Sequence, residues 1–286
     1  MSIPHPLKWW GGKSHLAKRI VALMPPRADA HPSGWLHYVE PYFGGGSVLL
    51  EQDPEGISEV ANDIHLELMN FWEVLRDPTR FAEFARDMSA TPFSEVDWQE
   101  AIRRHCFDHP DQLRLGRMQS ARHFFVLCRQ SMTGRMKSFA PLSRSRVRRG
   151  MNEQASAWLT AVEGLPAVHE RLKRVVVLNR PAIDVIRQQD GPRTLFYCDP
   201  PYVHETRATT GEYAHEMTHT DHLELLRVLK TVEGKVILSG YPSALYDEVL
   251  AGWRVVDFDL PNNAAGGAEK RRMTERCWMN YEETQP

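Results

Sequence analysis

Apolar residues follow two different spacings along this chain of 286 residues. Short apolar runs that end at Gly, Pro, Asn or Asp predict buried strands, whereas apolar residues three and four positions apart predict amphipathic helices. The runs predict strands at 35–39, 57–61, 175–178, 195–198, 235–239, 253–260 and 275–281. Helical spacing occurs at 16–24, 47–50, 183–188 and 222–229, with Ser14 and Ser47 as the expected N-caps of the first two helices. Strands that alternate with helices favour an α/β fold with a mostly parallel sheet.

The middle of the chain, from Leu66 to about Leu165, carries helical spacing and no strand pattern. Its expected helices cover 67–75, 78–88, 95–105, 113–128 and 153–163. We therefore predict one α/β core formed by residues 1–66 and 166–286, with residues 67–165 as a helical insertion. An insertion of this kind typically supplies recognition.

Basic charge is concentrated in this insertion. Residues 101–150 contain 12 Lys and Arg but two Asp, a net charge of +10, while the rest of the chain carries −12. Because each phosphate that a protein neutralises releases counterions, such a segment predicts contact with a polyanion. The alternative interpretation is a solvated arginine-rich face.

The composition, 42% hydrophobic and 25% charged, is typical of a folded globular protein. No stretch reaches the roughly 20 apolar residues of a membrane span, and the first residues show no secretory pattern, so we expect a cytoplasmic protein. The four cysteines form no C-x-x-C pair and have no His partner at zinc-ligand spacing. We expect reduced, mostly buried thiols and no metal site.

Most of the chemical information lies in Asp199-Pro200-Pro201-Tyr202, directly after the apolar run 195–198. Proline fixes its own backbone angle and lacks an N–H, so this turn is rigid and offers carbonyl oxygens beside the Asp199 carboxylate. Such acceptors suit an amino group, and Tyr202 offers a flat face to a base turned out of a duplex. The motif predicts a site that holds and methylates an exocyclic amine; the alternative is an ordinary turn with a solvated Asp and a packing Tyr.

A glycine turn, Gly44 to Gly46, follows the first expected β-strand after Glu40. In open α/β sheets ligands lie at the carboxyl ends of strands, where glycines let the backbone approach them. Leu49 replaces the last glycine of G-x-G-x-x-G, which argues against a dinucleotide. Glu40 can attract a cationic group, and Asp63, after the second strand, can accept hydrogen bonds from ribose hydroxyls. S-adenosylmethionine combines both features, although Asp63 also suits a turn or N-cap.

Together these motifs resemble those of the DNA adenine-N6 methyltransferases, the Dam-type and phage-type enzymes. The family's Lys-Trp-x-Gly-Gly-Lys stands at 8–13, its Glu-Pro-Phe-x-Gly-x-Gly at 40–46, its Asn-Asp at 62–63, its Asp-Pro-Pro-Tyr at 199–202 and its last strand at 275–280. Their order is that of the family's alpha group. The resemblance implies a Rossmann-like S-adenosylmethionine-dependent methyltransferase fold with an inserted target-recognition domain, acting on N6 of adenine in double-stranded DNA.

The resemblance also implies roles for particular residues at the cofactor. Trp9, Lys13, Asp63 and Asp199 would contact S-adenosylmethionine, with Phe43 and the backbone from Gly44 to Gly46 lining its pocket and Glu40 nearby. Tyr42-Phe43 replaces the family's Phe-x pair, so the ring that packs on the cofactor is left open.

At the base, Asp199 and the Pro200 carbonyl would hold the adenine amino group through its two hydrogens. Pro201 completes the rigid turn, and Tyr202 would stack on the flipped base. Most assistance would then come from positioning and electrostatics.

The expected DNA contacts are Arg129, Arg135 and Lys137. Leu127-Cys128-Arg129 is similar to the family, but residues 133–139 lack the Phe-Asn-Val-Pro run of Dam-type enzymes, so GATC recognition is not implied. Arginine in a basic loop contacts phosphate more often than a base.

Three other functions are compatible with parts of the pattern. N4-cytosine methylation also needs hydrogen-bond acceptors that hold an exocyclic amino group. A DNA-binding module with a degenerate cofactor site is less favoured, because every motif position that a working site requires is filled. A dinucleotide-dependent oxidoreductase is disfavoured by the missing glycine and by Asp-Pro-Pro-Tyr.

Overall fold

The computed structural model describes residues 3–105, 115–203, 215–261 and 272–282, and it divides into two compact units. Unit 1 comprises Met1–Ala22, Phe43–Asp53 and Asp63–Asn179, and unit 2 comprises Leu23–Tyr42, Pro54–Asn62 and Arg180–Pro286. The predicted insertion lies within unit 1, together with the N-terminal motif and the glycine turn. The boundary between core and insertion at residues 67 and 165 stays a prediction.

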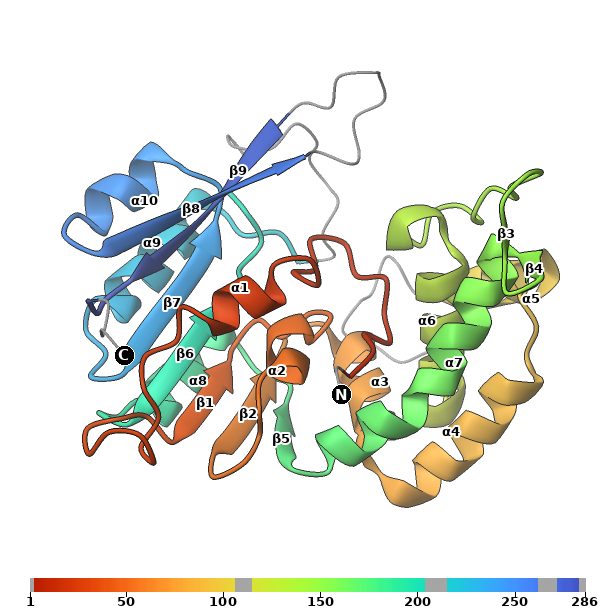
Figure 1. The fold of residues 1–286 in the computed structure, drawn as a ribbon, viewed down its shortest axis with the longest axis horizontal. Helices are drawn as coiled ribbons and strands as arrows, with labels where there is room; N and C mark the ends of the chain where they lie inside the picture. The colour runs from red at the N-terminus through yellow and green to blue at the C-terminus, as the bar shows by residue number, and fades with distance from the viewer. Residues whose placement is uncertain (1–2, 106–114, 204–214, 262–271, 283–286) are drawn as a thin grey trace. The chain divides into compact units, whose positions relative to one another are not determined.

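Seven strands form one sheet in the order β5-β2-β1-β6-β7-β9-β8, in which β5 is Val175–Leu178 (Figure 1). The strands of unit 2 are β1 (His37–Glu40), β2 (Ser58–Asn62), β6 (Thr194–Cys198), β7 (Lys235–Gly240), β8 (Arg254–Pro261) and β9 (Arg272–Met279). β2, β1, β6 and β7 run parallel, and β9 is antiparallel to both β7 and β8. The predicted mostly parallel α/β fold is confirmed.

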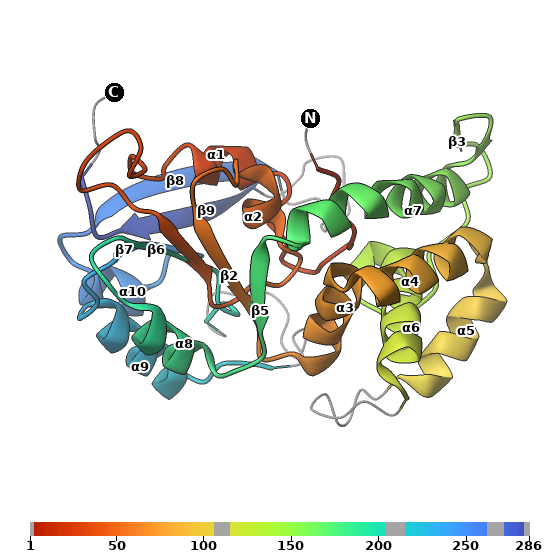
Figure 2. The same cartoon turned by 90° about the horizontal axis from the view of Figure 1, so that it is seen from below.

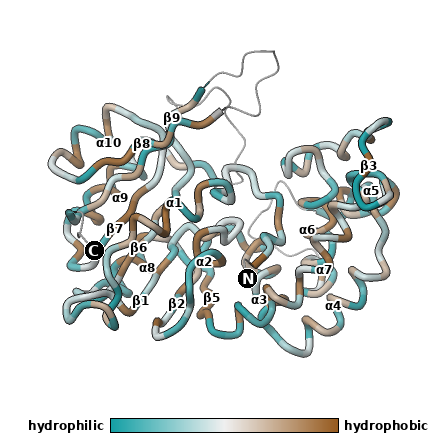
Figure 3. Tube along the Cα trace, viewed as in Figure 1, coloured by the Kyte–Doolittle hydropathy of each residue, from teal (hydrophilic) through white to brown (hydrophobic). Residues whose placement is uncertain are grey.

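Helices α8 (Ala182–Gln189), α9 (His219–Leu229) and α10 (Ala244–Val249) lie along one face of the unit 2 strands (Figure 2). β6 is buried along its whole length and β7 from Val236 onwards, which is why both read as continuous apolar runs. In Figure 3 these strands are coloured mainly as hydrophobic, whereas the helices alternate between hydrophobic and hydrophilic residues along their length.

The strand register brings four polar residues to one edge of the sheet. Glu40 pairs with Ala61, the neighbour of Asn62, while Cys198 pairs with Leu238. Because parallel strands end at the same edge, Glu40, Asn62, Asp199 and Ser239 gather there.

Unit 1 is largely helical. Its elements are α1 (Ala17–Val21), α2 (Ser47–Glu51), α3 (Leu66–Arg76), α4 (Pro78–Ala90), α5 (Glu95–Arg104), α6 (Arg117–Gln130), the 3₁₀ turn η1 (Met132–Gly134), β3 (Val147–Arg148), β4 (Met151–Asn152), α7 (Glu153–Leu172) and β5 (Val175–Leu178). Aromatic rings from three helices fill its core: Phe71 stacks on Phe125 at 5.7 Å, and Phe125 lies 5.3 Å from Trp158. Side-chain caps begin α4 and α5, at Asp77 and Ser94.

Several expected boundaries were wrong. Ser14 does not cap α1, because the Lys13 carbonyl accepts from Leu16 and Ala17 and forms a turn instead. The N-cap of α2 is Gly46, and Ser47 is its first residue. The short ribbon β3-β4 contradicts the expectation that the insertion has no strands.

Helix α7 continues nine residues past its expected end at Glu163 and passes through Pro166. Leu165 and Leu172 are fully buried, so packing outweighs the missing proline N–H. α10 was not predicted because its six residues are too short to show a period.

No helix in the described ranges is long and apolar enough to cross a membrane. Cys128, Cys198 and Cys277 are buried, as expected, while Cys106 lies outside the described residues. Those ranges contain no group of three or more His, Cys, Asp or Glu placed to hold a metal ion.

Candidate active site

Residues Asp199 to Tyr202, which we call the acceptor corner, leave the end of β6 in unit 2. The Ser239 hydroxyl, at the end of β7, donates to Asp199 Oδ1 at 2.9 Å. Ser239 Oγ also lies 3.0 Å from the Tyr197 hydroxyl. The carboxylate is half-buried while the two hydroxyls beneath it are buried, so a network inside the sheet orients Asp199.

The other end of the corner is equally anchored. Tyr202 is 7% exposed, and its hydroxyl donates to the buried carboxylate of Glu275 on β9 at 2.6 Å. Its ring lies 4.3 Å from that of Tyr241, centroid to centroid. Pro200 is buried and Pro201 half-buried.

Glu40, at the end of β1, is 1% exposed and accepts a 2.7 Å hydrogen bond from the Tyr38 hydroxyl. Burial, with the nearby Glu40 carboxylate, raises the pKa of Tyr38 well above its ordinary value. Burial and the Asp199 carboxylate do the same to the pKa of Tyr197. Both tyrosines therefore stay protonated and act as donors beneath the strand ends.

The glycine turn of unit 1 is packed against aromatic rings. A Cβ at Gly44 would stand 2.8 Å from Trp9 Nε1, and one at Gly46 would stand 2.7 Å from the Phe43 ring. Both glycines also have positive φ, which other residues rarely adopt. The Trp9 ring thus lies on the turn.

Asp63 is joined to the same turn. Its Oδ2 accepts from the Gly44 N–H and its Oδ1 from the His65 N–H, both at 3.0 Å. The Trp72 indole donates to the Gly44 carbonyl at 3.1 Å. The bonds from Gly44 and His65 use two of the roughly four lone-pair sites that a carboxylate offers.

Two other predicted cofactor residues are buried. Lys13 is 4% exposed and donates to the Gly11 carbonyl at 3.1 Å. Phe43 is 3% exposed and packs on Trp72 at 5.1 Å, whereas Tyr42 is half-exposed. Of the adjacent pair, Tyr42 therefore presents the more accessible ring.

The basic candidates occupy different surroundings within unit 1. The Arg135 guanidinium stacks on Trp10, 3.9 Å from the ring centroid, and Lys137 is exposed. Arg129 is half-buried and donates to the Ala157 carbonyl at 3.0 Å; burial lowers its pKa. Burial, with the Arg129 charge nearby, also lowers the pKa of Lys8 to about 8.

The structure groups the predicted residues in two sets, each within one unit. Unit 2 holds Glu40 and the acceptor corner; unit 1 holds Trp9, Lys13, Phe43, Gly44, Gly46, Asp63, Arg129, Arg135 and Lys137. The chain connects them closely, since Glu40 stands three positions before Phe43 and Asn62 directly before Asp63.

Sequence reasoning missed the supporting hydroxyls Tyr38, Tyr197 and Ser239 and the carboxylate Glu275. One signal was available: a tyrosine stands two positions before Glu40 and before Asp199, and residues two apart share a face of a strand. Ser239 and Glu275 require the strand pairing to be known.

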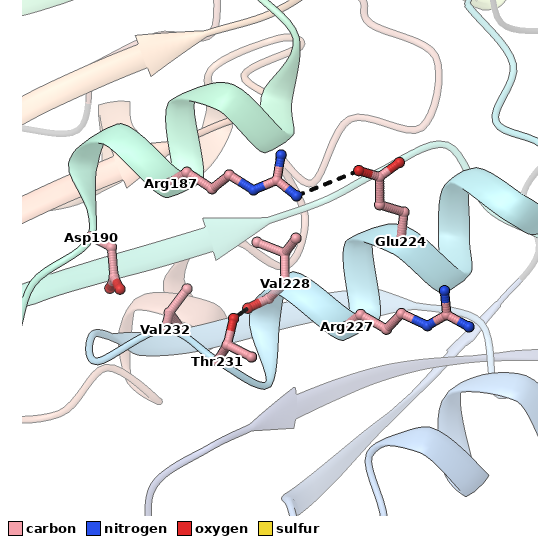
Figure 4. A pocket seen from close by; sticks show the side chains of 7 residues that line it. All are labelled: Arg187, Asp190, Glu224, Arg227, Val228, Thr231 and Val232. Carbon is pink, nitrogen blue, oxygen red and sulfur yellow. Dashed lines mark hydrogen bonds and ion pairs between the residues drawn. The ribbon is translucent and has the colours of Figure 1, made fainter.

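A cavity of about 400 Å³ between α8 and α9 holds none of the predicted residues (Figure 4). Arg187 and Glu224 form an exposed ion pair across it at 3.5 Å, and Asp190 caps Glu233 and Gly234. Its charges are thus largely balanced among themselves.

Comparison with known proteins agrees with the motifs. Residues 9–260 match the family described as D12 class N6 adenine-specific DNA methyltransferase. The chain is also similar to the Type II methyltransferase M1.LlaDCHI of Lactococcus lactis subsp. cremoris, at 24% identity over 287 residues, covering 96% of this chain and 94% of that protein. Since the family match covers most of the chain, the protein belongs to the D12 class N6 adenine-specific DNA methyltransferases, which transfer a methyl group from S-adenosylmethionine to N6 of adenine in DNA.

Proposed function

We propose that the acceptor corner receives the amino group of an adenine turned out of double-stranded DNA, at a specific sequence. The observation that carries this role is the Asp199 carboxylate, held at the carboxyl edge of the parallel strands by a buried hydroxyl. The name of the Lactococcus lactis relative, a Type II methyltransferase, supports sequence-specific modification.

Asp199 and the Pro200 carbonyl would each accept one N–H of the amino group. The two prolines cannot donate, so the turn offers the amine acceptors only. With both hydrogens held, the nitrogen lone pair is directed away from the corner. Tyr202, fixed by Glu275, would present its ring to the base. This assistance is positioning, which can supply a large part of a rate enhancement.

The residues around the glycine turn fit S-adenosylmethionine, which when bound supplies a methyl group on a positively charged sulfur. Asp63 would accept hydrogen bonds from the ribose, and the buried Glu40 would favour the positive charge. Trp9, Lys13, Phe43, Gly44 and Gly46 would form the walls of this site.

Arg135 and Lys137 would contact DNA phosphates. Lys137 is exposed, and both lie in the segment of net charge +10. The hydrogen bond from Arg129 to Ala157 supports a structural role, in which Arg129 holds α6 to α7. This role would be additional to any contact of Arg129 with DNA.

The direct test is to incubate the protein with unmethylated duplex DNA and S-adenosylmethionine and to digest the product to nucleosides. We expect N6-methyladenine. N4-methylcytosine would favour the cytosine alternative, and DNA binding without any methylation or cofactor binding would favour a DNA-binding module.

A further inference from the structure

We propose that Ser239, supported by Tyr197, is a positioning residue for methyl transfer: it fixes the orientation of the Asp199 carboxylate toward the amino group. The inference rests on the role proposed above for Asp199. It assigns a function to two buried residues that lie outside the Asp-Pro-Pro-Tyr motif.

Strand pairing places the three side chains together. β6 and β7 are parallel with Cys198 opposite Leu238, so the next residues along, Asp199 and Ser239, are neighbours. Tyr197 precedes Asp199 by two positions and therefore lies on the same face of β6. Ser239 is 0% exposed and Tyr197 2% exposed, so neither hydroxyl depends on solvent for its partners.

The direction of the hydrogen bonds follows from which of the three side chains has a proton to donate. An ionised carboxylate only accepts, so at 2.9 Å Ser239 must donate its single proton to Asp199. The Tyr197 hydroxyl, 3.0 Å from Ser239 Oγ, must then be the donor to Ser239. The Cys198 carbonyl, 3.4 Å from Ser239 Oγ, is a second and more distant acceptor for the same proton, so the shorter bond to Asp199 is the favoured one.

One such bond suffices to set the rotation of the carboxylate about its Cβ–Cγ bond. It does not use up the acceptor capacity of the group, because a carboxylate can accept about four hydrogen bonds. When fixed neighbours position a group that acts on the substrate, a small displacement of that group lowers the reaction rate but leaves the binding affinity unchanged.

The rival explanation is that Tyr197 and Ser239 only satisfy each other in the core. That explanation predicts lost stability and no selective loss of rate. Tyr246 offers a matched control, since it is a buried tyrosine of the same unit, 2% exposed, that is affected by the Asp199 charge but whose hydroxyl forms its hydrogen bond with His222, at 2.9 Å.

The experiment compares Ser239→Ala, Ser239→Thr, Tyr197→Phe, the double variant Ser239→Ala/Tyr197→Phe, and Tyr246→Phe. Single-turnover methylation of duplex DNA at saturating S-adenosylmethionine gives the rate, and calorimetry with S-adenosylhomocysteine and equilibrium DNA binding give the affinities. Thermal unfolding follows the stability of each variant.

We expect Ser239→Ala to slow transfer about 10- to 100-fold, the range found when a supporting hydrogen bond to a functional group is removed, with both affinities within about twofold of the parent. Ser239→Thr, which keeps the hydroxyl, should recover most of the rate. Tyr197→Phe should slow transfer about threefold to tenfold, and the double variant should be no slower than Ser239→Ala, because Tyr197 acts through Ser239.

A Ser239→Ala rate within twofold of the parent would overturn the inference, as would equal slowing by Tyr197→Phe and Tyr246→Phe. If Ser239→Ala does not fold, the comparison of Tyr197→Phe with Tyr246→Phe decides. Asp199→Ala, measured in parallel, separates the two proposals: an active Asp199→Ala refutes the role of Asp199, whereas an inactive one beside a fully active Ser239→Ala refutes only the positioning role.

Discussion

Buried hydroxyls beneath charged groups are the recurring feature at the strand ends. Tyr38 donates to Glu40, and Tyr197 reaches Asp199 through Ser239. The carboxylates were predictable because each ends an apolar run and is followed by proline. The donors were not, because Tyr and Ser in a buried strand are also ordinary core residues and only the register shows what they touch.

Lys8 provides a pH-dependent prediction. Burial and the nearby Arg129 lower its pKa from 10.5 to about 8, so a substantial uncharged fraction should exist at pH 8. We expect the acylation of Lys8, followed by mass spectrometry across pH 6 to 11, to show a midpoint near 8.

The variant Arg129→Gln removes one of the two causes, and the midpoint should therefore move upward. An unchanged midpoint in this variant would show that burial alone is responsible. A midpoint near 10.5 in the parent protein would contradict the buried placement of Lys8.

The glycine turn belongs to the proposed cofactor site, and the loop after α6 carries the proposed DNA contacts Arg135 and Lys137. Both segments pack against the N-terminal motif. Trp9 contacts Gly44, and a Cβ at Gly134 would stand only 1.8 Å from the Lys8 carbonyl oxygen. Thr133, Gly134 and Met136 all have positive φ, and strained backbone of this kind is common at functional sites. The sequence predicted the turn from its glycines, but not the loop, whose conformation is determined by this packing.

Gly44→Ala should weaken cofactor binding. The new Cβ would press on Trp9, so we expect a loss of stability of about 2 kcal/mol and at least a tenfold weaker affinity for S-adenosylhomocysteine. Gly56→Ala is the control, since Gly56 also has positive φ but nothing lies within 4 Å of its Cβ position. Denaturant unfolding and calorimetry of both variants check this; equal effects would mean that backbone strain alone matters.

Lys137→Ala should lower DNA affinity by a similar factor for all sequences and reduce the slope of log affinity against log salt by about one. Lys173→Ala, a lysine at the end of α7 that pairs with Glu170, should leave both unchanged. A sequence-dependent effect of Lys137→Ala would instead indicate contact with a base.

Across the chain, the order of motifs and the alternation of strands and helices were sufficient to predict the fold class and the family. The net charge of −2 conceals a basic segment of +10, a charge that is compatible with the family's DNA substrate. Exact element ends were less predictable, because packing decided them, as in α7 beyond Glu163. The recognition sequence was not predictable, because residues 133–139 of the proposed recognition insertion depart from the Dam-type run.

The most direct test of the account is single-turnover methylation by Asp199→Ala at saturating S-adenosylmethionine, with equilibrium binding of the same duplex measured alongside. Removal of the carboxylate should slow methyl transfer at least about 100-fold while DNA affinity changes by less than about threefold. Transfer at a rate close to that of the parent protein would contradict the central claim that this carboxylate holds the adenine amino group.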